Sequence, residues 1–498
     1  MSYGLETAAR PETLRRVAID PISRVEGHGK VTILLDDEGK VHQVRLHIVE
    51  FRGFEKFIQG RPYWEVPVMV QRLCGICPVS HHLAASKAMD RVVGARRLTP
   101  AAERIRRLMH YGQMLQSHAL HFFHLASPDL LFGFGSDAAK RNIVGVAAAH
   151  PDTARRGVLL RKFGQEVIRV TAGKRIHGTG SIPGGVNKAV TREERDYLLA
   201  DLYTFVGWCR DAVALAKELH GADPALYNSF GVFRSGLLSL VGPDGGLDFY
   251  DGKLRARDEN GAIHFDGVDA ADYGTRIHEA VRPWSYMKFP FLADKGEEHG
   301  WYKVGPLARV QNCDFIPTPL AEKERREFVD YAGGVPIHAP LAYHWARMIE
   351  MLHAAETIKD LLHDDELLGR DLLAGGPRAN EGVGIIEAPR GTLIHHYRVG
   401  EDDLVTMCNL IVSTTHNNQA MNEAIRHVAK RYLSGKTLTE GLLNHIEVAI
   451  RAFDPCLSCA THALGRMALE VSLVDADGTA IDRLVRHGDG TVGREPGA

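Results

Sequence analysis

The chain has 498 residues, of which 45% are hydrophobic and 24% charged, so it can bury a large core in two or three domains or in one domain with large insertions. Its 60 Lys and Arg against 62 Asp and Glu give a formal net charge of -2, which offers no basic field to a nucleic acid or an anionic membrane. No uncharged run approaches the roughly 18 apolar residues of a membrane span, and the N-terminal segment lacks the apolar core of an export signal. We therefore expect a cytoplasmic globular protein that is not inserted in a membrane.

The predicted elements begin with a β-hairpin at residues 31–49, where two alternating, β-branched runs flank an Asp-Asp-Glu-Gly turn. Helical spacing of apolar residues then dominates the chain, at 101–126, 192–220, 341–362, 417–433 and 438–453. A stretch rich in Gly and Asp at 241–268 predicts a small β-excursion on the surface. The expected fold is mainly α with smaller α+β parts: a long-helix bundle core with an N-terminal hairpin and peripheral strands. The expected boundaries are 1–60 for the hairpin region, 61–462 for the helical core and 463–498 for a C-terminal extension.

Two Cys-x-x-Cys pairs lie near opposite ends of the chain. Cys74 and Cys77 precede Pro78 and a run with helical spacing, which predicts a helix start where the backbone dipoles favour thiolates. Around Cys456 and Cys459 the pattern repeats, and we expect a helix that begins at Pro455 and is capped by the preceding Asp. Two helix starts would then present four thiolates to one point.

The simplest alternative is a structural zinc site with four cysteine ligands. Zinc ribbons usually hold their pairs roughly 15–20 residues apart in a small domain without its own core, whereas these pairs join the two ends of a large chain. A pair of thioredoxin-like redox motifs is disfavoured, because neither pair follows a βαβ pattern. Seven cysteines in so long a chain also do not make a disulfide framework, so a metal site is the leading interpretation.

Five short motifs carry a resemblance to a known family. The segments RLCGICPVSHHLA (72–84) and DPCLSCATH (454–462) are similar to the two signature motifs of nickel–iron hydrogenase large subunits. RVEGH (24–28), FRGFE (51–55) and EAPRG (387–391) look like further motifs of that family in the expected order. The form of the two cysteine motifs most resembles the bidirectional, cytoplasmic, NAD-reducing branch. The resemblance implies a large-subunit-like fold and reversible cleavage of H2 to protons and electrons.

The resemblance implies a nickel–iron centre whose iron carries CO and cyanide. Cys74 and Cys456 would be terminal nickel ligands, while Cys77 and Cys459 would bridge nickel to iron, and soft thiolates suit both metals. Heterolysis of H2 releases a proton, which Cys456 would receive first and Glu26 of the RVEGH motif next. Apart from that motif, Glu26 would be read as an ordinary solvated carboxylate.

Four more residues have expected roles around the iron. Arg390 of EAPRG corresponds to an arginine beside the cyanide ligands, where a guanidinium can donate to an anion. Thr414 is the expected cyanide donor, although Ser413 and His416 depart from the usual family residues there. Asp129 resembles an aspartate paired with that arginine. Asp454 would order the site or only cap a helix.

A hard-cation site near the C-terminus also follows from the resemblance. Glu55, His462 and the carbonyl of Leu410 match the ligands of magnesium or a similar ion, and oxygen and imidazole donors fit that chemistry. Among the remaining histidines, His28 and the adjacent His81 and His82 are worth attention.

Electrons need a partner, because the three other cysteines are scattered and provide no iron–sulfur motif. The Gly-rich segment 177–185 fails the dinucleotide fingerprint and 434–437 fails the P-loop, so we expect no NAD, flavin or ATP in this chain. The expected partners are an iron–sulfur small subunit and diaphorase-type subunits that carry flavin and NAD. NADP or a deazaflavin remain alternative acceptors.

A different class of function is a structural or quinone-site subunit related to respiratory complex I, which shares the fold. The four cysteines argue against it, because that relative lacks the metal thiolates.

The resemblance also implies processing of the C-terminal tail. In the hydrogenases, a maturation endopeptidase removes the tail after nickel insertion, here after His462 or Ala463. The alternative is a permanent C-terminal helix and hairpin within 467–485.

Overall fold

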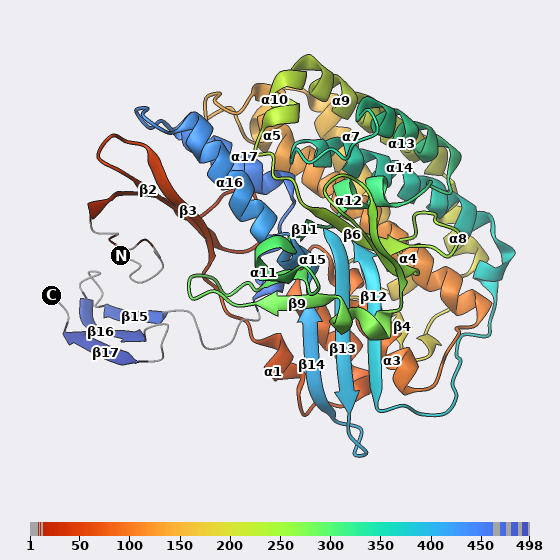
Figure 1. The fold of residues 1–498 in the computed structure, drawn as a ribbon. Coiled ribbons are helices and arrows are strands. Elements are labelled where there is room, and N and C mark those ends of the chain that lie inside the picture. The colour runs from red at the N-terminus through yellow and green to blue at the C-terminus, as the bar shows by residue number, and fades with distance from the viewer. Residues whose placement is uncertain are drawn as a thin grey trace.

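The computed structural model of the chain describes residues 8, 10, 13–461, 469–474, 480–486 and 491–496. Figure 1 shows a large body of helices and small sheets, with the N-terminal sheet and the C-terminal sheet toward one side. The sheets in these ranges have two to four strands each, whereas the longest helices exceed twenty residues. The predicted mainly α fold with smaller α+β parts is confirmed.

The N-terminal sheet contains the predicted hairpin. Strands β1 (Arg15–Ile19), β2 (Gly29–Leu35) and β3 (Val41–Ile48) are antiparallel and lie in that order, so β1 is a strand outside the predicted hairpin. Alternate residues of β2 are buried in the same hydrophobic cluster as the long helices. The sheet therefore shares the main core, and the expected domain boundaries at residues 60 and 462 stay predictions.

Helices make up most of the body. The longer ones are α3 (Pro78–Val92), α4 (Pro100–Leu120), α7 (Pro151–Ala172), α8 (Arg192–Leu199), α9 (Leu202–Ala222), α13 (Pro319–Tyr331), α14 (Ala342–His363), α16 (Asn418–Tyr432) and α17 (Glu440–Ala452). The shorter ones are α1 (Phe54–Ile58), α2 (Val66–Met69), α5 (Ser127–Phe132), α6 (Ile143–Ala149), α10 (Pro224–Ser229), α11 (Gly296–His299), α12 (Pro306–Asn312) and α15 (Ser413–His416). Four of the five predicted helices are confirmed, with a π-helical turn following α4. The fifth, predicted for 192–220, is wrong as one helix, because the chain breaks between α8 and α9.

The long helices α4 and α7 pack unusually closely. Thr99 begins α4 by accepting a hydrogen bond from the Ala102 amide, as an N-cap does. Where the helices cross, a Cβ on Gly112 would lie 2.7 Å from Val167, and one on Gly164 would lie 2.6 Å from the Gly112 carbonyl. Glycine is therefore required at this crossing, which fixes α4 in the middle of the molecule.

Another close contact positions the helix that carries the first cysteine pair. Strands β12 (Glu381–Ala388), β13 (Gly391–Val399) and β14 (Val405–Ile411) form an antiparallel meander, and α3 packs on β12. A Cβ on Gly384 would lie 2.1 Å from the Ala84 carbonyl of α3. The glycine lets the helix backbone rest directly on the sheet.

The remaining strands surround this meander. β6 (Gly236–Val241), β7 (Lys253–Arg257), β8 (Ile263–Val268) and β11 (Tyr302–Lys303) form one sheet in the order β11-β6-β7-β8, β9 (Ile277–Ala280) pairs with β10 (Phe289–Leu292), and β4 (Ser181–Ile182) pairs with β5 (Gly185–Val186). The predicted strands within 241–268 are confirmed, but the expected surface position is wrong for β7. Its centre is buried, and only β8 is largely exposed.

The C-terminal extension forms a sheet. β15 (Leu469–Val474), β16 (Ala480–Arg486) and β17 (Val492–Pro496) are antiparallel neighbours in that order. The alternative prediction of a C-terminal helix at the start of residues 467–485 is therefore wrong, because residues 469–474 form strand β15. Its branched residues at alternate positions favour a strand.

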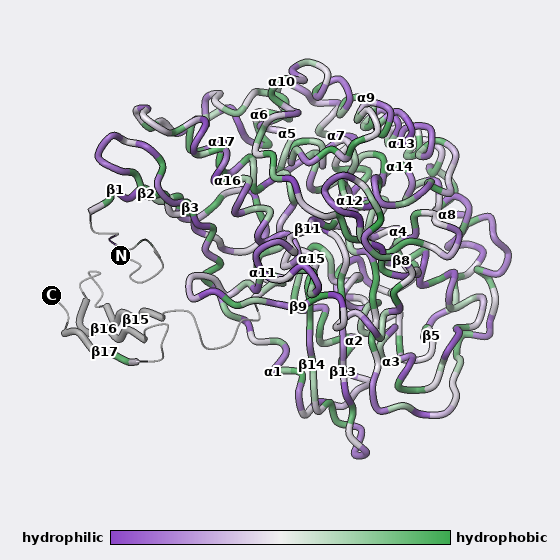
Figure 2. Tube along the Cα trace, in the orientation of Figure 1, coloured by the Kyte–Doolittle hydropathy of each residue, from purple (hydrophilic) through white to green (hydrophobic). Residues whose placement is uncertain are grey.

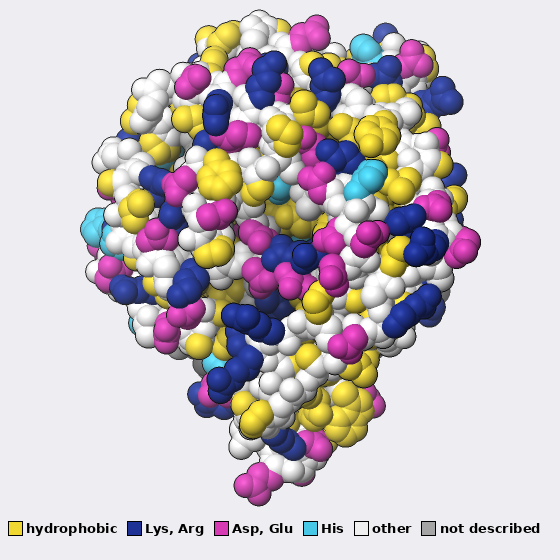
Figure 3. All heavy atoms as spheres, turned by 90° about the vertical axis from the view of Figure 1, so that its right-hand side faces the viewer, with side chains coloured by type: hydrophobic (Ala, Val, Ile, Leu, Met, Phe, Trp, Pro, Cys, Tyr) yellow, Lys and Arg dark blue, Asp and Glu magenta, His cyan; other side chains and the backbone are white. Residues whose placement is uncertain are grey.

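Hydrophobic and hydrophilic segments are interspersed along the Cα trace in Figure 2. On the face drawn in Figure 3, basic and acidic side chains are interspersed, consistent with the balanced charge of the chain. Within the described ranges, no helix combines the length and the apolar run needed to cross a bilayer.

Candidate metal centre

The first cysteine pair lies at a helix start, as predicted. Cys77 occupies the N-cap position of α3 and Pro78 its first turn, while Cys74 ends a short 3-10 helix. The amides of Ile76 and Cys77 both donate to the Cys74 sulfur at 3.2 Å. Burial alone would raise the pKa of Cys74, but the hydrogen bond from Cys77 and the positive charge of Arg390 outweigh it and lower the pKa. The loop therefore stabilises a thiolate at Cys74.

The second pair is held differently, and the predicted helix at Pro455 is wrong. Helix α17 ends at Ala452, Asp454 has a left-handed φ of 54°, and only a 3-10 turn at Ser458–Ala460 follows. The amides that would open a helix are bonded to distant segments instead. The Cys456 amide donates to Thr414 Oγ1 at 2.9 Å.

The RVEGH segment supplies the other support. The Leu457 amide donates to the Glu26 carbonyl at 2.9 Å, which forms an isolated parallel bridge between Glu26 and Cys456. The Ser458 amide donates to the Glu26 carboxylate at 3.2 Å. One residue thus fixes the second pair through both its backbone and its side chain.

All four cysteines converge on one buried point. Their sulfur atoms lie within 4.8 Å of one another, with Cys74 and Cys456 3.2 Å apart and Cys456 in disulfide contact with Cys459. Four buried sulfurs so close together suit a soft metal centre. The predicted convergence of the two ends of the chain is present.

Glu26 connects this point with the surface. The Cys456 sulfur lies 3.0 Å from an oxygen of the Glu26 carboxylate, close enough for that carboxylate to accept a proton from the reduced thiol. The same carboxylate lines an open cavity of about 580 Å³, together with His28, Glu50, Phe51 and others. His28 and Glu50 approach each other to 2.6 Å there. A proton held at Cys456 therefore has an acceptor that faces solvent.

Arg390 and Asp454 form a buried ion pair behind the sulfurs. Arg390 donates to the Asp454 carbonyl at 2.6 Å and to its carboxylate at 3.1 Å. Burial raises the pKa of Asp454, and the positive charges of Arg390 and Arg347 only partly offset this. Burial alone would lower the pKa of Arg390, but the negative charges of Asp454 and of the Cys77 and Cys74 thiolates outweigh it and raise the pKa. Among the described atoms, Nη1 of Arg390 has no hydrogen-bond partner although it is buried. A buried guanidinium N–H without an acceptor costs folding free energy, so a bound anion that accepts from this group would stabilise it.

A small cavity beside the sulfurs offers the place for such an acceptor. Arg390, Thr414, Cys77 and Cys456 are among the residues that line it. Thr414 accepts from the Cys456 amide, so its own hydroxyl proton stays free to donate. Thiolates on one side and two donors on the other fit a metal that carries small anionic ligands such as cyanide.

The expected pairing of Asp129 with Arg390 is wrong. Asp129 lies 2.6 Å from Arg24, contacts Arg451 and accepts from Asn444 at 3.0 Å. Arg390 pairs with Asp454 instead. Burial alone would raise the pKa of Asp129, but the positive charges of Arg451 and Arg24 outweigh it and lower the pKa, so the carboxylate stays charged. Asp129 thus anchors the RVEGH segment through Arg24, one step away from the sulfurs.

The expected hard-cation ligands are only partly described. Glu55 is largely buried and accepts from the Leu410 amide at 2.9 Å, which brings these two residues together, while His462 lies outside the described residues. The Lys288 ammonium lies 3.4 Å from Glu55 and 3.2 Å from Glu279. Burial raises the pKa of Glu55, and Lys288 only partly offsets this. A cation site at Glu55 would thus share its carboxylate with an ammonium group.

Two charged residues near the site, Lys288 and Glu279, could not be predicted from the sequence, and two histidines that drew attention there have different surroundings. Lys288 and Glu279 belong to no motif, so the sequence carries no signal for them. His81, which was singled out, lines the sulfur cavity and approaches His395 to 3.1 Å. Its neighbour His82 instead contacts the Pro67 carbonyl at 2.7 Å, a structural role.

Comparison with known proteins identifies the family to which the chain belongs. A HoxL-like family model matches residues 16–51, and the model for nickel-dependent hydrogenases matches residues 52–132 and 249–462. The chain is 48% identical to the NAD-reducing hydrogenase HoxS subunit beta of Cupriavidus necator, over 95% of this chain and 100% of that protein. It is 42% identical to one chain of the F420-non-reducing hydrogenase vhc of Methanococcus voltae, over 91% of this chain and 96% of that protein. A crystal structure of an NAD+-reducing nickel–iron hydrogenase in the H2-reduced state superposes with a TM-score of 0.89 and 62% identity, covering 90% of this chain and 99% of that one.

The chain therefore belongs to the nickel-dependent hydrogenase family. It is an oxidoreductase that acts on H2, and the cluster of Cys74, Cys77, Cys456 and Cys459 could bind the nickel–iron centre of that family. The zinc scaffold and the structural subunit related to complex I are thereby set aside.

Proposed function

We propose that this chain is the H2-activating subunit of an NAD-reducing hydrogenase, and that Glu26 carries the proton away from Cys456. The observation that carries the proposal is the 3.0 Å contact between the Cys456 sulfur and a carboxylate that also lines an open cavity. When bound, the nickel–iron centre supplies the heterolytic cleavage of H2 into protons and electrons. Cys74 and Cys456 would hold nickel alone, while Cys77 and Cys459 would bridge to the iron.

Glu26 moves one proton between a defined donor and solvent. Its Oε2 lies 3.0 Å from the Cys456 sulfur, from which it would accept the proton, and is kept in place by the Ser458 amide at 3.2 Å. Rotation of the carboxyl group toward the cavity would release the proton near the His28–Glu50 pair. A short, fixed donor–acceptor distance favours fast proton transfer.

Arg390 and Thr414 would hold the cyanide ligands of the iron. Arg390 has a buried N–H without an acceptor, and Thr414 has a free hydroxyl proton after accepting from the Cys456 amide. Asp454 keeps the guanidinium in position by accepting from it at 3.1 Å. Glu55, the carbonyl of Leu410 and His462 remain the proposed ligands of a magnesium-like ion, next to Lys288.

The proposed partner is an iron–sulfur small subunit that docks beside the Glu26 cavity. Five exposed apolar side chains lie within residues 49–68 of the chain: Val49, Phe51, Phe57, Trp64 and Val68. Phe51 lines the cavity itself. Large exposed apolar side chains grouped in this way mark interaction surfaces.

Electrons would continue from the small subunit to diaphorase-type subunits that reduce NAD. The support is the similarity to a subunit of an NAD-reducing enzyme and to an NAD+-reducing hydrogenase of known structure. Coupling to NAD would place the complex in the cytoplasm.

A maturation endopeptidase would remove the tail after His462 or Ala463. Measurement of the intact mass of the active subunit tests this cleavage. A catalytically competent subunit that still ends at Ala498 would overturn it.

The test of the proton route uses the complete complex carrying Glu26→Gln, which keeps the shape of the side chain but removes its titrating oxygen. We expect normal nickel and iron content, normal infrared bands of CO and cyanide, and a loss of H/D exchange and H2 oxidation of at least about 100-fold. Glu38→Gln, at an exposed glutamate of the N-terminal hairpin turn, is the matched control and should leave all readouts unchanged. Near-normal exchange in Glu26→Gln would exclude the route, and absence of nickel and iron from the unmodified chain would exclude the proposed function.

The test of the docking surface replaces exposed apolar side chains by charges. Trp64→Asp combined with Phe57→Asp should abolish co-purification of an iron–sulfur subunit, whereas Tyr203→Asp, at an even more exposed aromatic residue on α9, should not. Equal recovery of the partner with both variants would contradict the proposed surface.

A further inference from the structure

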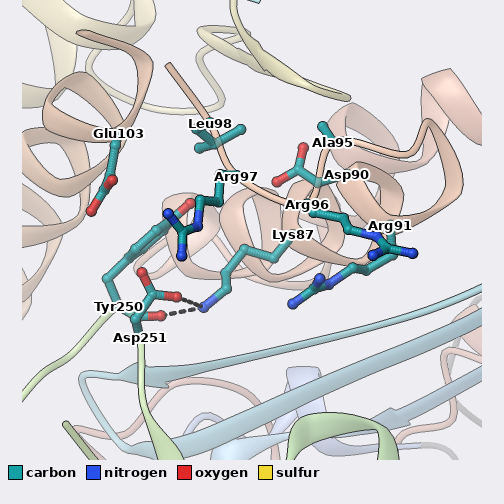
Figure 4. Close-up of a pocket in the computed structure, with 10 residues that line it drawn as sticks. All are labelled: Lys87, Asp90, Arg91, Ala95, Arg96, Arg97, Leu98, Glu103, Tyr250 and Asp251. Carbon is teal, nitrogen blue, oxygen red and sulfur yellow. Dashed lines mark hydrogen bonds and ion pairs between the residues drawn. The ribbon is translucent and has the colours of Figure 1, made fainter. Parts of the chain in front are cut away.

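A separate cavity lies at the end of α3 that is farthest from the cysteines. It has a volume of about 380 Å³, within the range of small-molecule sites. It is lined by the last turns of α3, the connection to α4, the first turn of α4 and the loop before β7, as Figure 4 shows: Lys87, Asp90, Arg91, Ala95, Arg96, Arg97, Leu98, Glu103, Tyr250 and Asp251. Lys87 is the lining residue nearest to Cys77 along α3, so about 15 Å of helix separates this cavity from Cys77.

The acidic groups of the cavity already have partners. Asp90 accepts two bonds from Arg106 at 2.6 and 2.9 Å. Asp251 lies 2.7 Å from Lys87 and 3.1 Å from Arg107. Burial would raise the pKa of Asp251, but Lys87 and Arg107 lower it more. Both carboxylates are therefore paired with cations, and Arg91 also lowers the pKa of Asp251, whereas no carboxylate in the described ranges forms an ion pair with Arg96 or Arg97.

Glu103, the remaining acid, is shared in the same way, because it lies 3.1 Å from Arg107. No carboxylate or carbonyl in the described part of the chain accepts a hydrogen bond from the side chains of Arg91, Arg96 or Arg97. All three are exposed at the cavity. In Figure 4, Arg91 and Arg96 lie side by side, and Arg97 lies over the opposite part of the cavity beside Tyr250.

The backbone holds two of these arginines in place. Gly94 has a left-handed φ of 72°, and a Cβ there would lie 2.3 Å from the Pro377 carbonyl, so the turn is pressed against a neighbouring segment. The Ala95 amide donates to the Asp90 carbonyl at 2.8 Å and the Arg96 amide to the Gly94 carbonyl at 3.0 Å. Arg96 and Arg97 therefore project from a rigid turn between two long helices.

The N-terminus of α4 adds to the positive potential, since Leu98 and Glu103 at that helix start both line the cavity. The Tyr250 ring is not open for stacking, because Lys87 lies 4.6 Å and Arg107 5.2 Å from its centre. What the cavity offers a ligand is thus guanidinium N–H groups from two sides, and no aromatic platform for a base.

We propose that this cavity binds a small anion with two or more phosphate groups, held by Arg91, Arg96 and Arg97. Guanidinium forks match phosphate oxygens in pairs, and three of them around one concavity need more than a single charge to be satisfied. The phosphate chain would bridge Arg97 on one side and Arg91 with Arg96 on the other. Free polyphosphate and the diphosphate of a nucleotide share this chemistry, and the lack of a stacking surface means that the phosphates alone are recognised.

The test measures binding of inorganic pyrophosphate to the purified full chain by isothermal titration calorimetry at fixed ionic strength. Arg96→Gln combined with Arg97→Gln should weaken binding by roughly 100-fold, about tenfold per charge-assisted contact. Arg192→Gln combined with Arg210→Gln removes the same charge from exposed positions on α8 and α9 and should leave binding within about twofold. Arg97→Lys, which keeps the charge but loses the fork, should weaken it by roughly tenfold.

The outcomes separate the sources and can overturn the proposal. ADP binding as tightly as pyrophosphate means recognition of the diphosphate alone, as proposed, whereas ADP binding at least tenfold tighter contradicts it by revealing contacts to the nucleoside. Equal weakening by the two double variants would mean diffuse attraction to positive charge and would overturn the site. No measurable pyrophosphate binding to the unmodified chain would overturn it as well, and circular dichroism of each variant shows whether it is folded. None of these results depends on the metal centre or on hydrogenase activity.

Discussion

The two cysteine pairs have the same spacing and meet at one point, but the chain holds them in different ways. Cys74 and Cys77 lie at the start of α3, a fifteen-residue helix that packs on β12, and local amides bond the Cys74 sulfur. Cys456 and Cys459 lie on a short turn whose amides are bonded to Glu26 and Thr414.

This difference separates a locally encoded half of the site from a half that exists only in the folded molecule. A helix start is specified by its own residues, such as Pro78 in the first turn. The second half requires segments more than 40 and more than 400 residues away to be in place first. We therefore expect substitutions near the second pair to be more damaging than matched substitutions near the first.

The largest expected effect comes from Arg390→Met. Removing the guanidinium leaves the buried Asp454 carboxylate without its partner, which costs about 3–5 kcal/mol in free energy of unfolding. The matched change beside the first pair is Arg52→Met, which removes bonds of 2.8 Å to the Leu73 and Arg72 carbonyls. Arg52 is exposed, so water replaces it and the loss stays below about 1 kcal/mol. Denaturant unfolding of the full chain measures both, and similar losses would remove the asymmetry.

Gly27→Ala should be the next most damaging change. Gly27 has a φ of 82°, and an added Cβ would lie 2.6 Å from the Ser458 amide nitrogen, so either Glu26 or the second pair must move. Backbone strain and overpacking together cost about 2–4 kcal/mol, and nickel content should fall. Gly75, between the cysteines of the first pair, has no atom within 4 Å of an added Cβ. Gly75→Ala should therefore retain nickel, and loss of nickel from Gly75→Ala alone would reverse the comparison.

The same division explains what could be predicted from the sequence. Helix α3 and its cysteines followed from local signals, Pro78 and apolar spacing, that act over one or two turns. The helix expected at Pro455 did not form, although the local signals were alike, because Glu26 and Thr414 take the amides that would have opened it. Such tertiary competition leaves no trace within a short window of sequence.

Pairings of charged residues show the limit more clearly. The family resemblance brought Arg390 and Asp129 to attention, but it could not say that Asp454 takes the arginine while Asp129 binds Arg24. Lys288, against Glu55, was not anticipated at all, because a lone lysine in a loop carries no pattern. Three of the long helices, α14, α16 and α17, lie within two residues of their predicted bounds, since their apolar spacing is repeated over several turns, whereas the range 192–220 is divided between α8 and α9 and α7 was not predicted.

A smaller effect is expected from Thr414→Val, which keeps the shape of the side chain. The buried Cys456 amide loses its acceptor, at a cost of about 1–3 kcal/mol. Near the first pair, Ser80 has a buried hydroxyl for which no partner occurs among the described residues, so Ser80→Ala should change the free energy of unfolding by less than about 0.5 kcal/mol. Thermal unfolding of the two variants would resolve the difference. A larger loss in Ser80→Ala would mean that the first pair also depends on side-chain contacts.

The smallest expected effect needs no substitution and follows from removing the metal. In the metal-free chain, the amides of residues 456–458 depend on three single hydrogen bonds to other segments, whereas those of α3 belong to a continuous helix that rests on β12. Local opening of the second pair should become easier by about 1.4 kcal/mol, because the thiolates no longer tie it to the first pair. Hydrogen–deuterium exchange measured by mass spectrometry should then be about tenfold faster for peptides within 454–461 of the metal-free chain than in the metal-loaded chain, and unchanged for peptides within 80–92. Equal acceleration of both regions would show that the metal, and not the helix, holds the first pair in place, and the two halves of the site would then be equivalent.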